Sequence, residues 1–447
     1  MKAESPVSAQ GSGAPEKRQK VLLVGVAFSQ ADSTGEGTLD ELAALADTAG
    51  MMVLDRLMQR RESPDARYFI GKGKAQEIAD LCERLEIDAV LFDHELSPAQ
   101  ARNLEKLTEA AILTRTEVIL HIFAGRARTR QARLQVELAQ LKYEMPRLRR
   151  MWTHLSRIEG GVRRGGVGAG RGPGETQLEV DRRASRKRVR ELERSLEQIQ
   201  RRKETETGPR KEQLTIALVG YTNVGKSSLM NALTGTGAFV EDRLFATLDA
   251  TTRLLTTPQK QTALLTDTVG FIRNLPHDLV ASFQATLEEV REANLLLHVA
   301  DVTSEQLDAQ MAAVRDVLTE LACHETPTLT VLNKADRLPK ATALSELCAR
   351  YDNAVVVSAH TGSGLDQLLT AIDERMAAAQ AQVRIRTAPG DGRLRAYLAE
   401  HGTVLGEAYS GTETTFDALV GPRVLGRLRQ QFPDASITET RKAPVAK

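Results

Sequence analysis

Eight consecutive residues have the types and spacing needed to bind the phosphates of a nucleotide. They follow the apolar run 214–219 and precede a helical run over 228–233, which is the context that the Walker A pattern requires. The glycines let the backbone form a nest of N–H donors at a helix N-terminus, where the helix dipole favours anionic oxygens. We expect Lys226 to reach the β- and γ-phosphates and Ser227 Oγ to ligate Mg²⁺. The eight residues are Gly220, Tyr221, Thr222, Asn223, Val224, Gly225, Lys226 and Ser227.

A second phosphate-binding segment follows about 40 residues downstream, where it closes the apolar run 263–265. Its residues are Asp267, Thr268, Val269 and Gly270. An acidic residue at a strand end can hold Mg²⁺ through a water molecule, and a glycine N–H can meet the γ-phosphate. We therefore expect Asp267 at the metal site, and Gly270 beside Lys226 among the catalytic groups.

Two further segments have the groups that recognise guanine. The carboxylate of Asp336 can accept hydrogen bonds from N1–H and from the exocyclic amine, and an adenine base would leave it unpaired, which predicts about 10⁴-fold rejection. Lys334 is expected to lie along the base plane, Asn333 to join this loop to the P-loop, and the Ala359 N–H to meet the guanine oxygen. The segments are Asn333-Lys334-Ala335-Asp336, after the apolar run 328–332, and Ser358-Ala359-His360, after 354–357.

The segment between the two phosphate motifs is expected to be mobile and to supply a threonine to Mg²⁺ and the γ-phosphate. We prefer Thr247, with Thr251 and Thr252 as alternatives. The neighbours of Thr247 that we expect at the nucleotide are Phe245, Ala246, Leu248 and Asp249.

Phe271 follows Gly270, at the position where many GTPases have a glutamine that orients the attacking water. An apolar side chain cannot do this, so we predict slow intrinsic hydrolysis and acceleration by a partner. Arg253 and Arg273 could stabilise charge during hydrolysis, although an ordinary surface role is the alternative for each.

The elements that must position these residues imply a multidomain α/β protein. At 447 residues the chain exceeds what one core usually serves. Residues 1–19 are expected to form a disordered leader, and alternating apolar and helical runs over 20–125 predict a small α/β domain with a parallel sheet. A GTP-binding domain, with a mixed but mostly parallel sheet and helices on both faces, is expected over 213–380, and a small α+β domain over 381–447.

Residues 126–212 are predicted to form a basic helical hairpin. Apolar stripes at helical spacing over 134–145 and 189–199 flank the loop 160–174, in which eight of 15 residues are Gly. Residues 126–190 carry 18 Arg or Lys against six Asp or Glu, although the net charge of the whole chain is only +1. This charge favours contact with RNA phosphates, and a solvated helical face is the alternative. The candidate contacts are Arg163, Arg164 and Arg171.

Composition is that of an ordinary globular protein, with 41% hydrophobic and 27% charged residues. Three widely spaced cysteines argue against a disulfide framework or a zinc site. The sequence has neither an apolar run of membrane-spanning length nor a secretory signal. We expect a cytoplasmic monomer that binds GTP and GDP with Mg²⁺ and has at most peripheral contact with membranes.

The order of these motifs, with the glycine-rich hairpin directly upstream, resembles the HflX family of ribosome-associated P-loop GTPases. Four further stretches are similar to that family, namely residues 67–74, 92–97, 130–145 and 165–179. The resemblance implies a GTPase that binds the large ribosomal subunit through ribosomal RNA and acts in ribosome splitting, rescue or biogenesis.

Two other functions are compatible with parts of the sequence. One is a nucleotide-gated binding protein that docks the basic hairpin on a protein or an anionic membrane surface, with hydrolysis incidental. The other is an RNA-remodelling ATPase, which Asn333 and Asp336 disfavour because they specify guanine. Co-sedimentation with ribosomes or liposomes separates the first from a ribosomal GTPase, and competition by ATP tests the second.

Overall fold

The structure is a computed structural model, and its two compact units are described one at a time. They comprise residues 1–122 with 149–161, and residues 123–148 with 162–447. No helix in the part of the chain that is described is long and apolar enough to span a bilayer. The described residues are 18–28, 35–159, 173–206, 214–235, 244–245, 247, 249–273, 284–323, 325–338, 350–351, 353–411 and 413–441.

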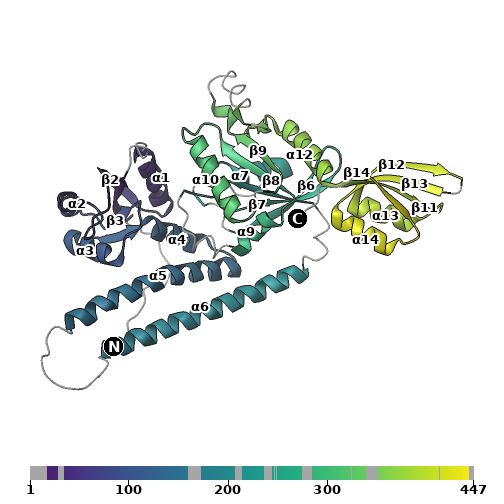
Figure 1. Cartoon of the computed structure of the whole chain (residues 1–447). Coiled ribbons are helices and arrows are strands. Elements are labelled where there is room, and N and C mark those ends of the chain that lie inside the picture. The colour runs from purple at the N-terminus through teal and green to yellow at the C-terminus, as the bar shows by residue number, and fades with distance from the viewer. Residues whose placement is uncertain are drawn as a thin grey trace, which may run out of the picture. The chain divides into compact units, whose positions relative to one another are not determined.

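The N-terminal sheet, whose strands β2 and β3 are labelled in Figure 1, is parallel throughout and has the strand order β2-β1-β3-β4. Its core combines alternate residues of β1 (Leu22, Val24, Val26) with side chains of α2 and α3. Helix α3 begins with a reciprocal capping box between Ser97 and Gln100. The elements are β1 (Lys20–Ala27), α1 (Gly35–Thr48), β2 (Met52–Arg60), α2 (Lys72–Leu85), β3 (Ala89–Phe92), α3 (Pro98–Thr108), β4 (Ala111–Thr114) and α4 (Arg115–Arg126).

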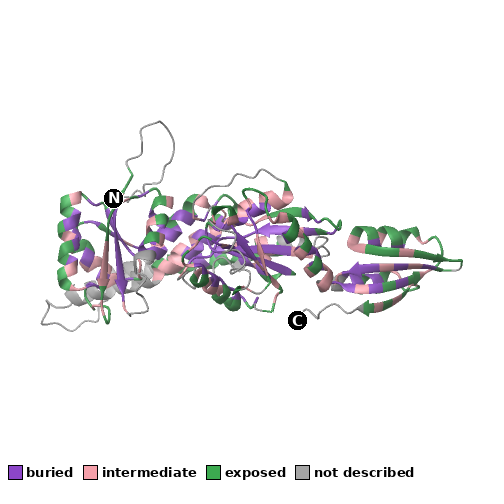
Figure 2. Cartoon of the chain, turned by 90° about the horizontal axis from the view of Figure 1, so that it is seen from above, coloured by how far each residue is buried: buried purple, intermediate pink, exposed green. Residues whose placement is uncertain are grey.

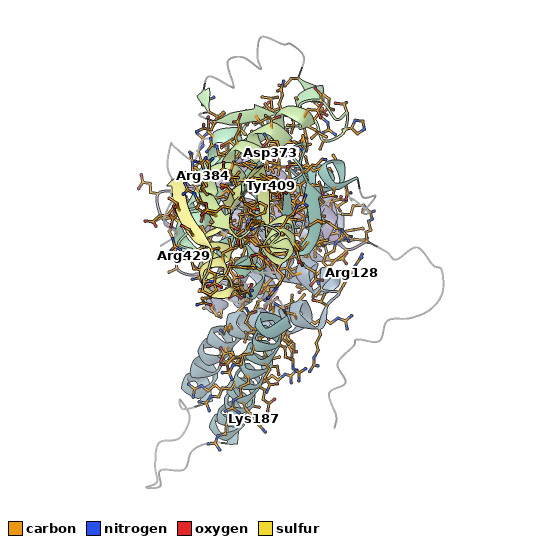
Figure 3. The ribbon with its side chains drawn as sticks, turned by 90° about the vertical axis from the view of Figure 1, so that its right-hand side faces the viewer. Arg128, Lys187, Asp373, Arg384, Tyr409 and Arg429 are labelled. Atoms are coloured by element: carbon orange, nitrogen blue, oxygen red, sulfur yellow. The ribbon has the colours of Figure 1, made fainter. Side chains whose placement is uncertain are left out.

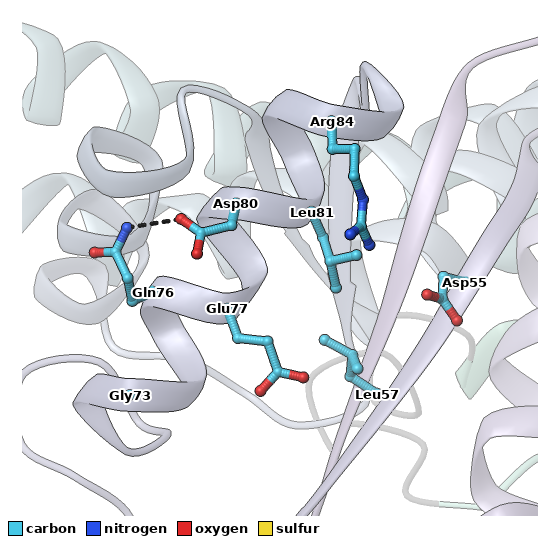
Figure 4. Close-up of a pocket in the computed structure, with 8 residues that line it drawn as sticks. All are labelled: Asp55, Leu57, Gly73, Gln76, Glu77, Asp80, Leu81 and Arg84. Carbon is cyan, nitrogen blue, oxygen red and sulfur yellow. Dashed lines mark hydrogen bonds between the residues drawn. The ribbon is translucent and has the colours of Figure 1, made fainter.

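A groove of about 650 Å³ runs between the edge strand β2 and helix α2 (Figure 4). Its polar lining is mainly acidic, with Asp55, Glu77 and Asp80 against Arg84. Lys74, at the start of α2, is paired with Glu77 at 2.8 Å. Acidic groups repel phosphate, so this groove does not have the charge of a nucleotide site.

The hairpin helices are α5 (Arg130–Glu159) and α6 (Pro173–Glu206). The two predicted stripes pack together, with Leu138, Val189 and Leu192 at the buried centre. A bidentate pair between Arg188 and Glu137, at 2.7 and 3.0 Å, adds a contact on the surface. The predicted loop ends earlier than expected, because α6 begins at Pro173, and proline is favoured at a first helical position. Arg163, Arg164 and Arg171 lie outside the described residues.

A six-stranded sheet with order β10-β9-β8-β5-β7-β6 follows, and only β6 is antiparallel to its neighbour. The carboxyl ends of its five parallel strands therefore share one edge, where α/β sheets bind ligands. The central strands β5, β7, β8 and β9 are largely buried (Figure 2), whereas the edge strand β6 is mostly exposed. The elements are β5 (Leu214–Gly220), α7 (Lys226–Thr234), β6 (Thr251–Thr256), β7 (Thr262–Asp267), α9 (Gln284–Arg291), β8 (Leu295–Asp301), α10 (Leu307–Glu320), β9 (Thr328–Asn333), the 3₁₀ helix η3 (Ala335–Arg337), β10 (Ala354–Val356) and α12 (Leu365–Ala379).

The C-terminal elements form a β-α-β-β-α-β arrangement with the antiparallel order β12-β13-β11-β14. Leu394 and Leu398 of α13 and Leu428 of α14 join one core with the strands, so both helices cover the same face. Arg384 of β11, labelled in Figure 3, is exposed and donates from Nε to Asp417 of β13 at 2.8 Å. The elements are β11 (Ala381–Thr387), α13 (Gly392–His401), β12 (Gly402–Ser410), β13 (Glu413–Val420), α14 (Pro422–Gln431) and β14 (Ser436–Arg441).

Candidate functional site

The P-loop joins β5 to α7, and two of its glycines are required by close approaches. A Cβ on Gly220, whose φ is +152°, would lie 2.2 Å from the backbone oxygen of Val299. A Cβ on Gly225, whose φ is +90°, would lie 2.4 Å from Asn333 Nδ2. Both conformations are ones that glycine adopts readily, so the loop can curl tightly at the start of α7.

Lys226 lies inside this loop. Its Nζ donates to the carbonyl oxygens of Gly220 at 3.2 Å and Tyr221 at 2.7 Å. Burial lowers its pKa to about 8, and the nearby Asp267 carboxylate acts in the opposite direction. A Cβ on Gly270 would be 3.0 Å from this ammonium group and 2.9 Å from Thr222 Cα. Gly270 thus lies where only a residue without a side chain fits against the P-loop.

Three oxygen atoms converge beside the P-loop. Ser227 Oγ donates to Asp267 Oδ2 at 2.5 Å, and Thr247 Oγ1 donates to the same oxygen at 3.0 Å. The two hydroxyl oxygens are 2.9 Å apart. Asp267 Oδ1 is buried and has no hydrogen-bond partner among the described residues. Two hydroxyls and a carboxylate with spare acceptor capacity are an oxygen donor set that suits Mg²⁺.

Burial raises the pKa of Asp267, while Lys226 and the hydroxyls of Ser227 and Thr247 oppose the shift. A bound cation would favour the ionised carboxylate in the same way as these partners. The next residue, Thr268, is fully buried, and its hydroxyl donates to the backbone oxygen of Leu218 at 2.6 Å. Thr268 therefore fixes the end of β7 against β5.

The two alternative threonines belong to β6. Thr252 Oγ1 lies 3.0 Å from Thr266 Oγ1, and Thr251 is paired with Asp267 in the β6–β7 register. Thr247 alone of the three predicted candidates is hydrogen-bonded to both Ser227 and Asp267. Ala246 and Leu248 lie outside the described residues.

The segment predicted to bind the base is tied to the P-loop by Asn333. Its Nδ2 donates to the carbonyl oxygen of Val224 at 2.9 Å, and its Oδ1 accepts from the Ala359 N–H at 3.0 Å. One buried side chain therefore joins the P-loop to the ends of β9 and β10. The Ala359 amide that we expected at the guanine oxygen donates to Asn333 in this structure.

Asp336 and Lys334 are also held by specific partners. Ser358 Oγ donates to Asp336 Oδ1 at 2.6 Å, and this hydrogen bond lowers the pKa of the exposed carboxyl group. Asp336 is thus kept ionised, as an acceptor for two guanine N–H groups must be. Lys334 Nζ donates to the Asn223 carbonyl at 2.7 Å and pairs with Asp301 at 2.7 Å. His360, beyond Ala359, is exposed.

Phe271 is buried beside the P-loop. Its backbone bonds to Gly220 and Thr222 at 3.0 and 2.8 Å, and its side chain is only 2% exposed. The backbone N–H of Arg273 donates to Tyr221 Oη at 2.9 Å. Arg253 projects from β6 as an exposed residue. None of these contacts gives the site a water-orienting group.

Asp301 is a site residue that our sequence reasoning missed, along with its strand β8. The signal was available, because the apolar run 295–300 ends in an aspartate, as the run before Asp267 does. Strand β4 was missed as well, since its four residues are too short a run to show periodicity.

The chain has a P-loop, an acidic residue at the end of β7 and an Asn-Lys-x-Asp segment that begins at the end of β9. Together at the carboxyl edge of a mostly parallel sheet, these features define a P-loop GTPase. Comparisons with known families agree. The families described as "GTP-binding GTPase N-terminal", "GTP-binding GTPase Middle Region" and "50S ribosome-binding GTPase" match residues 36–124, 126–210 and 215–334.

Curated relatives extend the match over most of the chain. GTPase HflX of Escherichia coli is 45% identical over 84% of this chain and 87% of its own length. GTPase HflX of Caldanaerobacter subterraneus is 43% identical over 92% of this chain and 93% of its own. A solved GTP-binding protein of Sulfolobus solfataricus in complex with GDP is 24% identical, covers 80% of this chain and 98% of its own, and has a TM-score of 0.41. The chain belongs to the HflX family of GTPases.

Proposed function

We propose that this GTPase is magnesium-dependent, acts in the cytoplasm as a monomer and binds the large ribosomal subunit, where GTP hydrolysis serves ribosome splitting, rescue or biogenesis. The observation that carries the ribosomal part is the match of residues 215–334 to the 50S ribosome-binding GTPases. The exposed basic side chains of α6, Arg183, Arg186, Lys187 and Arg190, support a contact with RNA phosphates. Arg163, Arg164 and Arg171 of the glycine-rich loop are the proposed contacts at the hairpin tip.

In this proposal the chain's own groups bind and orient the triphosphate. The P-loop amides face the phosphates, and the Lys226 ammonium turns from two backbone carbonyls to the β- and γ-phosphates. The Gly270 N–H donates to the γ-phosphate. Asp336 accepts from the guanine, and the Ala359 N–H turns from Asn333 Oδ1 to the guanine oxygen. Ser227, Thr247 and, through water, Asp267 would hold Mg²⁺, which when bound neutralises charge on the phosphate oxygens.

Phe271 occupies the position where many GTPases have a glutamine, and because its side chain is buried and apolar it cannot orient water. GTP turnover by the purified chain should therefore be slow and should rise on the order of tenfold or more with large ribosomal subunits. Turnover measured with and without large subunits, with small subunits as the control, tests this. Equal turnover in all three samples would contradict the ribosomal role. Co-sedimentation with anionic liposomes but not with ribosomes would favour membrane docking instead.

A further inference from the structure

The segment that carries Thr247 is attached to the start of helix α5. The Asp249 carboxylate accepts hydrogen bonds from the backbone N–H groups of Arg128 and Thr129, both at 3.3 Å, and from the Thr129 hydroxyl. Thr129 directly precedes α5, and its hydroxyl accepts from the Ala132 N–H at 3.1 Å, as a helix N-cap does. Asp249 therefore lies at the positive end of the helix dipole, which stabilises a carboxylate.

Phe245 makes a second attachment to the same region. Its ring meets that of Phe123, at the end of α4, edge to face, with centroids 4.7 Å apart and planes at 82°. Phe245 is only 2% exposed, and its φ of +54° lies in a region that bulky residues rarely adopt. A phenylalanine keeps such a conformation only when its surroundings hold it there.

The two attachments flank Thr247, since Phe245 lies two residues before it and Asp249 lies two residues after it. Between them, Thr247 Oγ1 lies 3.0 Å from Asp267 Oδ2 and 2.9 Å from Ser227 Oγ. We propose that Thr129 and Phe123 are positioning residues for GTP hydrolysis, which hold Thr247 at the metal site through Asp249 and Phe245. The inference rests on the proposed role of Thr247 at magnesium and the γ-phosphate.

GDP lacks the γ-phosphate, so its affinity should not depend on where Thr247 lies, whereas that of a triphosphate should. The Asp249 carboxylate, which we expected at the nucleotide, is instead held by Arg128 and Thr129. Asp249→Ala removes this attachment and leaves the Thr129 cap on Ala132 intact. Calorimetry with magnesium should show roughly tenfold weaker binding of a non-hydrolysable GTP analogue, with GDP affinity within about twofold of wild type. GTP turnover should fall by a similar factor. Unchanged GDP affinity shows in the same experiment that the domain is folded.

Thr129→Val and Phe123→Leu should act in the same direction, and Thr129→Ser should restore analogue binding because it keeps the hydroxyl. The matched control is Ser97→Ala, which removes the side-chain cap of α3 in the other unit. It should leave both affinities unchanged. A loss of analogue binding in the control equal to that of Asp249→Ala would contradict the proposal.

Thr247→Val separates this inference from the function on which it rests. If this variant binds the analogue and magnesium like wild type, the role proposed for Thr247 at the metal site is wrong. The positioning role of Thr129 and Phe123 is then wrong as well. If Thr247→Val is impaired but Asp249→Ala and Thr129→Val are not, only the positioning is wrong. Equal weakening of GDP and analogue by Asp249→Ala, or faster turnover, would also overturn it.

Discussion

At the scale of single residues, we propose that guanine selection depends on the charge and hydrogen-bonding pattern of one side chain. Asp336 presents two acceptor oxygens, and the hydrogen bond from Ser358 keeps its pKa low. Asn333 performs a different task, since its amide joins the P-loop to the loop after β10. Recognition of the base and the shape of its site therefore depend on neighbouring residues with separate roles.

Asp336→Asn should reverse the base preference. An amide offers one acceptor and one donor, which pairs poorly with the two N–H groups of guanine but well with the N1–H and O2 of xanthine. Affinity for GDP should fall by roughly 10²-fold or more, and xanthosine diphosphate should bind better than GDP. Calorimetry with both nucleotides measures this. Retained preference for GDP would show that Asp336 does not contact the base.

At the scale of the elements, β8 carries a buried histidine beneath the P-loop. His298 is paired in register with Val219 of β5 and Thr330 of β9, and it is 3% exposed. Burial, then the positive charges of Arg315 and Lys226, lower its pKa to about 4. The imidazole is thus neutral in the folded protein at ordinary pH.

This shift makes the domain sensitive to acid. The pKa of His298 is about 4 folded and 6.5 unfolded, so the unfolded chain binds more protons between these values. The contribution of neutral His298 to the free energy of unfolding is therefore fully present above pH 6.5. It is lost as the pH falls towards 4, and the loss amounts to about 3 kcal/mol. In His298→Gln this part of the loss should vanish. The unfolding transition that GDP stabilises is measured at several pH values for wild type and His298→Gln. If the two proteins lose stability in parallel as the pH falls, the prediction is wrong.

At the scale of the whole molecule, charge is concentrated in one segment. The net charge is +1 over 447 residues, yet residues 126–190 carry 18 basic against six acidic side chains. The hairpin buries Leu138, Val189 and Leu192 between α5 and α6 and leaves charged groups such as Lys187 exposed. A slender basic element of this kind suits contacts with phosphates, which depend on salt.

Ribosome binding should therefore weaken steeply as salt is added. Replacing Arg163, Arg164 and Arg171 with Ser should reduce the slope of log K against log salt concentration by about 2. The matched control replaces three exposed C-terminal arginines, Arg386, Arg393 and Arg395. Sedimentation at several salt concentrations measures both slopes. A control that changes as much as the hairpin variant would show that the tip has no special part in binding.

The sequence by itself predicted the phosphate and base segments and the chemistry proposed for them, because short loops carry the necessary glycines, lysine and aspartate at fixed spacing. It also predicted the parallel sheets and the two packed stripes of the hairpin, which depend on local periodicity. The sequence also preferred Thr247 over Thr251 and Thr252, but only the tertiary structure showed its contacts with Ser227 and Asp267. The contacts of Phe123 with Phe245 and of Thr129 with Asp249 likewise emerged only in three dimensions.

The reason is separation along the chain. Thr129 meets Asp249 across 120 residues, and Asn333 meets Val224 across 109, so no local pattern records either contact. The C-terminal strand order β12-β13-β11-β14 is of the same kind, since it follows from how helices α13 and α14 cover one face of the sheet. Such contacts depend on how separate elements pack, and packing is a property of the folded chain.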